Sequence, residues 1–345
     1  MLHDGLSLGA AGERPGRLWW MGVAAAFVAL MVLPSFLNIF QQINLSVVFI
    51  LALLALSMSF LWGYAGILSF GQTAFFGLGG YAFAVLALNF GETTFSLLAA
   101  ILLAMLFAAL FGYFMIYGRI SDIYLSVMTL VITLIFEKAI KSTSGEWYVI
   151  GKVRLNGQNG IPTVPSLRVP WHPVKELGVD GVFYLSAGLL VLVYVGLRLL
   201  LTTPFGRVLV GIRENTRRIE LLGYDSRRYK LAAFIICGGI AALAGVLYGV
   251  WGNFVGPDMF GLKRAAEVIV WVIVGGKSTL AGPIAGTAIV QILKTRLGSE
   301  SVGEWLPLIL GVVLMLVVLV FRDGLLAGFG GAIVWIYRHI RGSAA

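Results

Sequence analysis

The chain has 345 residues, of which 59% are apolar when tyrosine is counted and only 12% are charged. Soluble domains carry roughly 45–50% apolar residues even with glycine included, and the mean hydropathy here is +0.94, so a water-soluble enzyme is excluded. The formal net charge of +9 indicates membrane topology rather than nucleic-acid binding, because basic residues collect in the cytoplasmic loops of membrane proteins.

Apolar runs long enough to cross a bilayer recur along the chain, since one helical span needs about 20 apolar residues. The first run, Leu18–Leu37, exceeds the roughly 7–15 residues of a signal-peptide core and lacks a small-x-small cleavage site, so it is expected to be a retained span. The further runs of spanning length are Ile43–Trp62, Phe95–Tyr117, Ile120–Ile140, Gly181–Leu201, Leu231–Trp251 and Trp305–Phe321.

Other segments are short or interrupted by glycine or proline, namely Ser69–Phe90, Ala265–Gly276 and Leu280 to about Leu293. Irregular backbone at membrane depth survives only where protein or a water-filled cavity covers it, and helix ends there can present polar groups to a substrate. Counting these segments as crossings gives about ten spans; in the alternative, the last two form a re-entrant pair. The predicted fold class is therefore all-α, a polytopic integral membrane helical bundle with broken or re-entrant segments.

Orientation is predicted from Leu201–Lys230, the longest strongly basic stretch between spans. The positive-inside rule puts this stretch in the cytoplasm, and about ten spans then put both termini there too. The expected organisation is a cytoplasmic tail at 1–17, a membrane domain at 18–321 with an external loop at 141–180 and a cytoplasmic loop at 202–230, and a tail at 322–345. The external loop also carries basic residues, against the rule. In the C-terminal tail, Leu325–Ile340 either lies along the membrane surface or crosses it.

Short motifs that suggest enzyme chemistry fail in their context. Gly275–Ser278 resembles the end of a phosphate-binding loop, but Trp271 stands where that motif needs glycine. Gly77–Ala82 has the spacing of a dinucleotide fingerprint, yet it lies in a membrane segment without a βαβ unit. The single cysteine, Cys237, has no partner for a disulfide or a thiolate metal site. The histidines are scattered at His3, His172 and His339, so we expect neither a metal site nor catalytic residues.

Two carboxylates, Glu137 and Glu267, lie near the ends of apolar runs. Each has basic residues close by in the sequence, so the expected role is charge pairing at the membrane boundary. The alternative is proton coupling in a secondary transporter that works without ATPases.

The basic stretch contains a predicted elbow. Ile212, Ile219 and Leu222 recur at helical spacing, with charged residues mostly turned elsewhere, which indicates a short amphipathic helix. Gly223 can end that helix in a left-handed conformation, and Asp225 or Ser226 can cap the next one. A motor protein could grip such a projection, because apolar anchors fill a groove while flanking charges fix the register. The alternative is a solvated basic loop at the lipid surface.

Several separated motifs follow one another in order between about Leu51 and Leu326. They are Gly63–Tyr81, Ile123–Ser126 with Thr129-Leu130, Asn159–Ile161, Phe205–Arg207, Leu222–Tyr224, Tyr229–Leu231 and Val274–Pro283. As a set they resemble the permease subunits of ATP-driven branched-chain amino acid importers, of the LivM type. The resemblance implies a non-catalytic, multi-pass protein of the bacterial inner membrane.

The resemblance also implies partners. Such a subunit pairs with a homologous second permease of the LivH type, docks two cytoplasmic ABC ATPase subunits and receives cargo from a periplasmic or extracellular substrate-binding protein. The chain itself would bind no cofactor, because ATP is used by the partner ATPases; contact with membrane lipid is expected, and nucleic acid is not. The elbow resembles the family's coupling loop, which makes the ATPase-docking candidates Arg213, Glu214, Asn215, Arg217, Arg218, Leu222 and Gly223.

The substrate is predicted less directly. Branched-chain or related hydrophobic amino acids are the first expectation, while Leu61–Tyr64 and Gln291–Thr295 look like the urea and short-chain amide branch of the family. A pathway for an amino acid needs groups for both charged ends and room for an apolar side chain; the candidates are Ser69, Gln72, Thr73, Phe75 and Phe76. The chain departs from the family pattern where Gln72 replaces a histidine, where Arg217-Arg218-Ile219 replaces acidic and small residues, and where Asp323 replaces proline-arginine.

Overall fold

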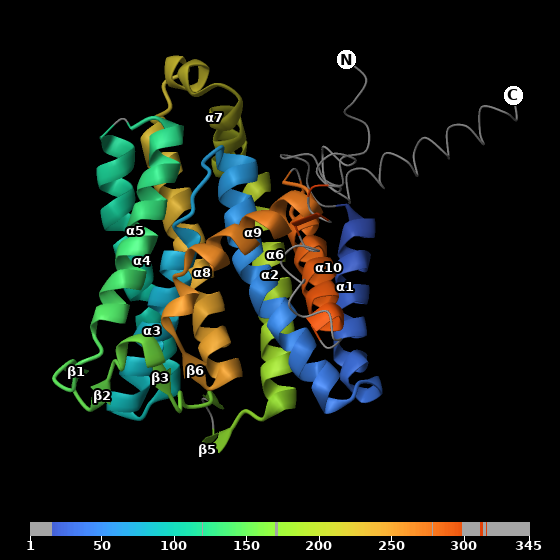
Figure 1. The fold of residues 1–345 in the computed structure, drawn as a ribbon. Coiled ribbons are helices and arrows are strands. Elements are labelled where there is room, and N and C mark those ends of the chain that lie inside the picture. The colour runs from blue at the N-terminus through green and yellow to red at the C-terminus, as the bar shows by residue number, and fades with distance from the viewer. Residues whose placement is uncertain are drawn as a thin grey trace, which may run out of the picture.

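The computed structural model describes residues 16–118, 120–169, 172–277, 279–298, 311–312 and 315. Within them the chain is mainly helical (Figure 1). The α-helices are α1 (Arg17–Val32), α2 (Ile39–Ala65), α3 (Gln72–Phe90), α4 (Thr93–Tyr117), α5 (Asp122–Ser142), α6 (Val179–Thr202), α7 (Pro204–Leu221), α8 (Ser226–Gly252), α9 (Leu262–Gly275) and α10 (Ala281–Gly298). The all-α membrane bundle predicted from the sequence is confirmed.

In the described part of the chain, 7 helices are long and apolar enough to cross a membrane: α1 with the 3-10 turn after it, α2, α3, α4, α5, α6 and α8. All but α3 correspond to predicted long spans. The predicted run Trp305–Phe321 falls almost wholly outside the described residues, and so do most of the N-terminal tail and Leu325–Ile340.

The sequence predicts an interruption within Ser69–Phe90. This is wrong for Gln72–Phe90, which forms the single continuous helix α3. Its glycines are helical and allow neighbouring helices to approach closely. A Cβ added at Gly79 would stand 2.6 Å from the Cα of Ala242 in α8, and one at Gly80 would stand 2.8 Å from the Cε of Met259. The irregular backbone lies just before α3 instead, in residues 66–71, which begin with the left-handed Gly66 directly after α2.

The segment left open by the sequence is a helical hairpin. Helix α9 has 14 residues, too few for the roughly 20 of a full span, and it runs obliquely across the bundle before α10 returns (Figure 1). A Cβ at Gly286 of α10 would stand 2.7 Å from the backbone N of Gly275 in α9, so the two arms pack with almost no side chain between them.

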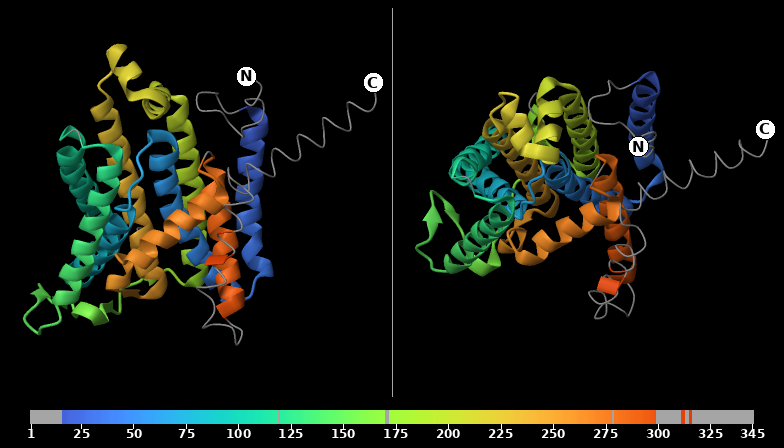
Figure 2. Two further views of the ribbon diagram at one scale, coloured as in Figure 1. Left: turned by 45° about the horizontal axis from the view of Figure 1, so that its top comes forward. Right: turned by 90° about the horizontal axis from the view of Figure 1, so that it is seen from above.

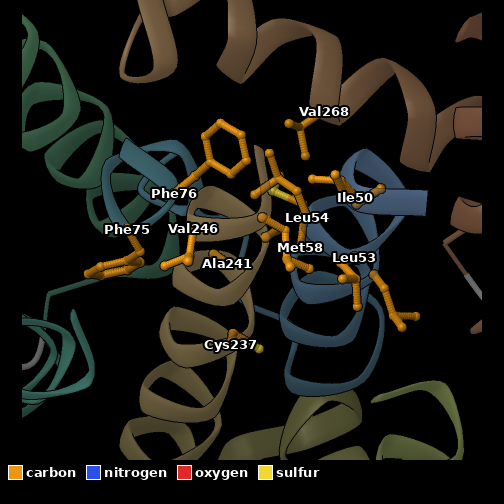
Figure 3. Packing of buried hydrophobic residues seen from close by; sticks show 14 of the residues in the cluster. Ile50, Leu53, Leu54, Met58, Phe75, Phe76, Cys237, Ala241, Val246 and Val268 are labelled. Carbon is orange, nitrogen blue, oxygen red and sulfur yellow. The ribbon is translucent and has the colours of Figure 1, made fainter. Parts of the chain in front are cut away.

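The core lies where α2, α3 and α8 meet, and α8 packs against α2, α3 and α4. Beyond their polar first turns, α2 and α8 are apolar on most sides, as expected for helices buried among others. Figure 3 shows Leu54, Phe76 and Val246 from these helices in one cluster, with Val268 of α9 above them. Figure 2 shows that α1 lies at the edge of the bundle, and only 6% of its span is buried.

One end of the bundle carries short strand pairs and 3-10 turns. The 3-10 turns are η1 (Leu33–Phe36), η2 (Gly157–Asn159) and η3 (Pro257–Met259), and the strands are β1 (Val149–Ile150), β2 (Val153–Arg154), β3 (Ile161–Pro162), β4 (Arg168–Val169), β5 (His172–Glu176) and β6 (Phe254–Val255). The antiparallel pairs are β1 with β2, β3 with β6 and β4 with β5. Asn89 in α3 holds the β1–β2 turn: its Nδ2 donates to the Ile150 carbonyl at 2.9 Å, and its Oδ1 accepts from the Lys152 N–H at 2.7 Å. Helix α7 lies at the opposite end (Figure 1).

Candidate functional site

The predicted elbow is built on α7, and the first half of this helix is fixed to the bundle. Thr203 precedes the helix, and its Oγ1 accepts a hydrogen bond from the Gly206 N–H at 3.4 Å. Pro204 occupies the first helical position, where a missing N–H costs little. The inward-facing residues Val208, Leu209 and Ile212 are buried, and α7 contacts α2, α6 and α8. This half of α7 is therefore packed firmly against the helices that it covers.

The helix bends at Asn215, whose backbone has φ −158° and ψ 96°. The Asn215 Oδ1 accepts a hydrogen bond from the Arg218 N–H at 2.9 Å, which is the arrangement of an N-cap residue at the start of a new helical turn. The apolar spacing predicts one helix over Ile212–Leu222 and does not reveal this bend. The available signal was the asparagine itself, because its side chain competes for backbone donors inside a helix.

The tip of the elbow has the predicted geometry. Gly223 has φ +89°, the left-handed conformation that favours glycine at a helix end, and the Asp225 side chain caps α8 by accepting from the Arg227 N–H at 3.1 Å. Apolar side chains are exposed here: Leu221 is 84% exposed and Leu222 68%. Such exposure is expected of a surface that another protein covers.

Arg213 does not project with the rest of the docking candidates. One guanidinium nitrogen donates to the backbone carbonyl of Gly63 in the last turn of α2, and a Cβ added at Gly66 would stand 3.2 Å from the Arg213 Cγ. The last carbonyls of a helix lack intrahelical donors and carry partial negative charge, so a cation stabilises them. Arg213, also paired with Glu214, thus joins α7 to the end of α2 although it is exposed. The other docking candidates are exposed as well: Glu214, Asn215, Arg217, Arg218, Leu222 and Gly223.

The α9–α10 turn reaches the same point. The Lys277 Nζ lies 5.2 Å from the centroid of the Trp62 ring, within the range of a cation–π contact. Gly63 packs directly on the backbone carbonyl of Lys277, with no room for a side chain. The end of α2 is therefore a junction between α7 and the α9–α10 hairpin.

Residues 66–71 run from this junction to the start of α3, and α5 supplies their hydrogen bonds. The Phe70 N–H donates to the Thr129 Oγ1 at 3.1 Å, the Ser126 Oγ donates to the Leu68 carbonyl at 2.7 Å, and the Thr133 Oγ1 lies 3.3 Å from the Phe70 carbonyl. Irregular backbone in a membrane protein needs such internal partners. The sequence analysis gave these hydroxyls no role, although they repeat along one face of an apolar helix.

The predicted pathway residues are brought together around the start of α3, and all are buried: Ser69, Gln72, Thr73, Phe75 and Phe76. The Phe75 ring centroid lies 5.4 Å from that of Phe234 in α8, and the Phe76 centroid lies 5.4 Å from that of Tyr248. These two rings therefore pack inside the chain.

Gln72 is different, because its amide is buried with an unsatisfied end. Its Oε1 lies 3.3 Å from the Ser57 Oγ, whose proton already goes to the Leu54 carbonyl at 2.7 Å, and its Nε2 has no hydrogen-bond partner. Rotating the amide lets Nε2 donate to Ser57, but then the oxygen is left without a donor. Gln72 is thus the pathway candidate with hydrogen-bonding capacity to spare.

Both boundary carboxylates are paired with cations. Glu137 lies 2.5 Å from the Lys141 Nζ, and Glu267 lies 2.9 Å from Arg264 and 2.9 Å from Lys294. The charge-pairing interpretation is thereby confirmed. Among the residues that the structure describes, no three His, Cys, Asp or Glu side chains gather as metal ligands.

Comparison with known proteins identifies the family. The family model for the permease component of the branched-chain amino acid transport system matches residues 38–321. The high-affinity branched-chain amino acid transport system permease LivM of Escherichia coli (strain K12) is 26% identical over 298 residues, covering 79% of this chain and 67% of the relative.

Other relatives are permeases of different transport systems. The inner membrane ABC transporter permease YjfF of Escherichia coli (strain K12) is 26% identical over 79% of this chain and 80% of its own length. The autoinducer 2 import permease LsrC of Salmonella typhimurium is 32% identical over 34% of this chain and 32% of its own. No solved structure matches. The match over residues 38–321 and the spanning helices show that the chain is a multi-pass inner-membrane protein that belongs to the family of branched-chain amino acid transport permease components.

Proposed function

We propose that this chain is one of two permease subunits in an ABC importer that carries branched-chain or related hydrophobic amino acids across the bacterial inner membrane. The observation that carries the proposal is the α7 elbow. It exposes an apolar tip while its other half is held by Arg213 to the end of α2. An exposed apolar tip of this kind marks a surface for interaction with another protein.

The tip is the docking surface for an ATPase subunit. Leu221 and Leu222 are the apolar anchors, and Arg217 and Arg218 are the charges beside them. Exposed leucines flanked by arginines suit a groove with an apolar floor and an acidic rim, in which the charges mainly set register and the rate of association. The chain itself holds no nucleotide in this proposal, and ATP is used by two partner ATPases.

Motion at the tip reaches the pathway through a short series of direct contacts. The ATPase moves α7, the buried half of α7 moves the end of α2 through Arg213, and the end of α2 is continuous with residues 66–71. That segment leads into Gln72 at the start of α3. The pathway is completed by a second permease, with Gln72 as the residue of this chain that offers its unsatisfied amide to the cargo. An external substrate-binding protein delivers the cargo at the end of the bundle that carries the strand pairs.

The first test is composition. The intact complex is extracted gently from native membranes, captured through this chain and analysed by mass spectrometry; we expect a second permease and two ATPase subunits. The captured complex is then placed in proteoliposomes with its binding protein, and uptake of leucine, isoleucine and valine is compared with uptake of urea, acetamide and autoinducer 2.

ATP-dependent uptake of the branched-chain amino acids supports the proposal in full. ATP-dependent uptake of urea or the amide alone would keep the importer and replace its substrate. Uptake driven by an ion gradient in vesicles depleted of ATP would refute the importer.

A further inference from the structure

A cavity of about 310 Å³ lies at the end of the bundle that carries α7. It is bounded on one side by the connection between α4 and α5, and on the other by the elbow, where α7 ends and α8 begins. It is separate from the pathway residues at the start of α3. One wall is polar and comes from the elbow, with Glu220, Arg227 and Lys230. The other wall is apolar and comes from α4, α5 and their connection, with Ile116, Ile120 and Leu125.

The polar wall favours an anion. It carries two basic side chains and one carboxylate, and that carboxylate, Glu220, already accepts a hydrogen bond from the Ser226 hydroxyl. The nearby Asp225 is shared between two arginines: its carboxylate lies 3.2 Å from Arg228 and 4.0 Å from Arg227. Arg227 is positioned by the ring of Tyr117, whose centroid lies 5.7 Å from the guanidinium carbon.

The apolar wall continues into the outer surface of the bundle. Phe114 in the last turns of α4 is 65% exposed, and Ile123 and Tyr124 in the first turn of α5 are 78% and 70% exposed. A hydrocarbon surround suits such apolar side chains. An occupant of the cavity can therefore place a charged group against Arg227 and Lys230 while a hydrocarbon chain leaves along α4 and α5.

We propose that this cavity binds the headgroup of an anionic phospholipid, with its phosphodiester at Arg227 and Lys230 and an acyl chain against Ile116, Ile120 and Leu125. Basic pockets between helices at the cytoplasmic boundary are suited to such headgroups. A small soluble anion would use only the polar wall and leave the apolar wall in contact with water. The bound lipid bridges the α4–α5 connection and the elbow, so it holds the elbow in position relative to α5 and to the segment that α5 supports.

The test uses the purified full-length chain in mixed micelles and native mass spectrometry. Phosphatidylglycerol is titrated against phosphatidylcholine for the unaltered protein, for Arg227→Gln with Lys230→Gln, and for Arg207→Gln with Arg228→Gln. The last pair removes the same charge from exposed arginines of the same region that do not line the cavity. We expect the cavity pair to lose at least tenfold in phosphatidylglycerol affinity and the control pair to stay within twofold.

Ile120→Trp gives an independent check, because it fills the apolar wall and keeps every charge. It should lose phosphatidylglycerol to a similar extent while the protein elutes as the unaltered chain does. Equal losses of phosphatidylglycerol affinity in the cavity pair and the control pair would refute the site. So would displacement of the lipid by millimolar inorganic phosphate, which would indicate a free-anion site.

A final arm depends on the proposed function. If stoichiometric ATPase subunits displace the lipid, the cavity is a protein-docking surface and the lipid proposal fails. If the lipid stays bound and raises ATP hydrolysis by the complex only when Arg227 and Lys230 are present, the proposal holds. Lipid binding to the isolated chain is measured without any ATPase, so failure of the importer proposal would leave this result intact.

Discussion

The sharpest prediction concerns Gly223→Ala, with Gly91→Ala as its matched control. Both glycines end a helix with positive φ, +89° at Gly223 and +72° at Gly91, and a Cβ at either position would meet nothing within 4 Å. The cost of each substitution is therefore backbone strain alone, about 1–2 kcal/mol for an L-residue held in this region. The two variants should lose similar stability, yet only Gly223 lies at the proposed docking tip.

A cost of about 1–2 kcal/mol lowers the ratio of the native tip conformation to its alternatives roughly 5–30-fold. If the ATPase recognises the native conformation, the Kd of the ATPase for the permease pair in nanodiscs should rise by up to this factor in Gly223→Ala and by less than twofold in Gly91→Ala. Surface-immobilised nanodiscs and purified ATPase would measure both values. Equal affinities in the two variants would show that the ATPase does not recognise the tip conformation and that the tip does not couple it to the permease.

Other substitutions separate coupling, charge pairing and helix packing. Arg213→Met should leave the complex assembled but abolish most transport-coupled ATP hydrolysis, because the hydrogen bond between α7 and the end of α2 is lost. Pull-down and ATPase assays with and without loaded binding protein check this, and normal coupling would contradict transmission through Arg213. Glu267→Gln should lower the free energy of unfolding by about 1–3 kcal/mol, because two cations lose their partner. The control, Glu146→Gln, should change it by less than about 0.5 kcal/mol, since that side chain is 87% exposed; melting curves in detergent compare the two variants. Gly79→Val should prevent stable insertion because its Cβ meets the α8 backbone, while Gly188→Val in α6, with nothing within 4 Å, should express normally; fluorescence-detected size exclusion decides between them.

The spans could be predicted from sequence because the bilayer imposes one simple requirement, an apolar run of sufficient length. The same rule fails for α3. The glycines of this segment predict interruptions, yet in the structure Gly79 lies in a continuous helix and packs against the backbone of α8. Whether a glycine breaks a helix or admits a neighbour depends on what packs against it, and a single sequence does not contain that information.

The candidate site divides in the same way. Gly223 and Asp225 follow local backbone rules, so their conformations could be predicted. Arg213 could not be separated from Arg217 and Arg218, because what distinguishes it is a carbonyl 150 residues away in the sequence. The support of residues 66–71 by hydroxyls of α5 was missed for the same reason: the partners are about 60 residues apart.

Helix α3 is fastened at both ends, and this has a mechanical consequence. Its 19 residues form a rod of about 28 Å at 1.5 Å per residue. At one end Asn89 holds both sides of the β1–β2 turn, and at the other the rod continues into residues 66–71 and the end of α2. Because a hydrogen-bonded helix hardly changes length, a displacement along its axis at one end is passed on to the other end. In the proposed importer, cargo delivery at one end of the bundle and ATP binding by the partner subunits at the other would therefore act on opposite ends of this one helix.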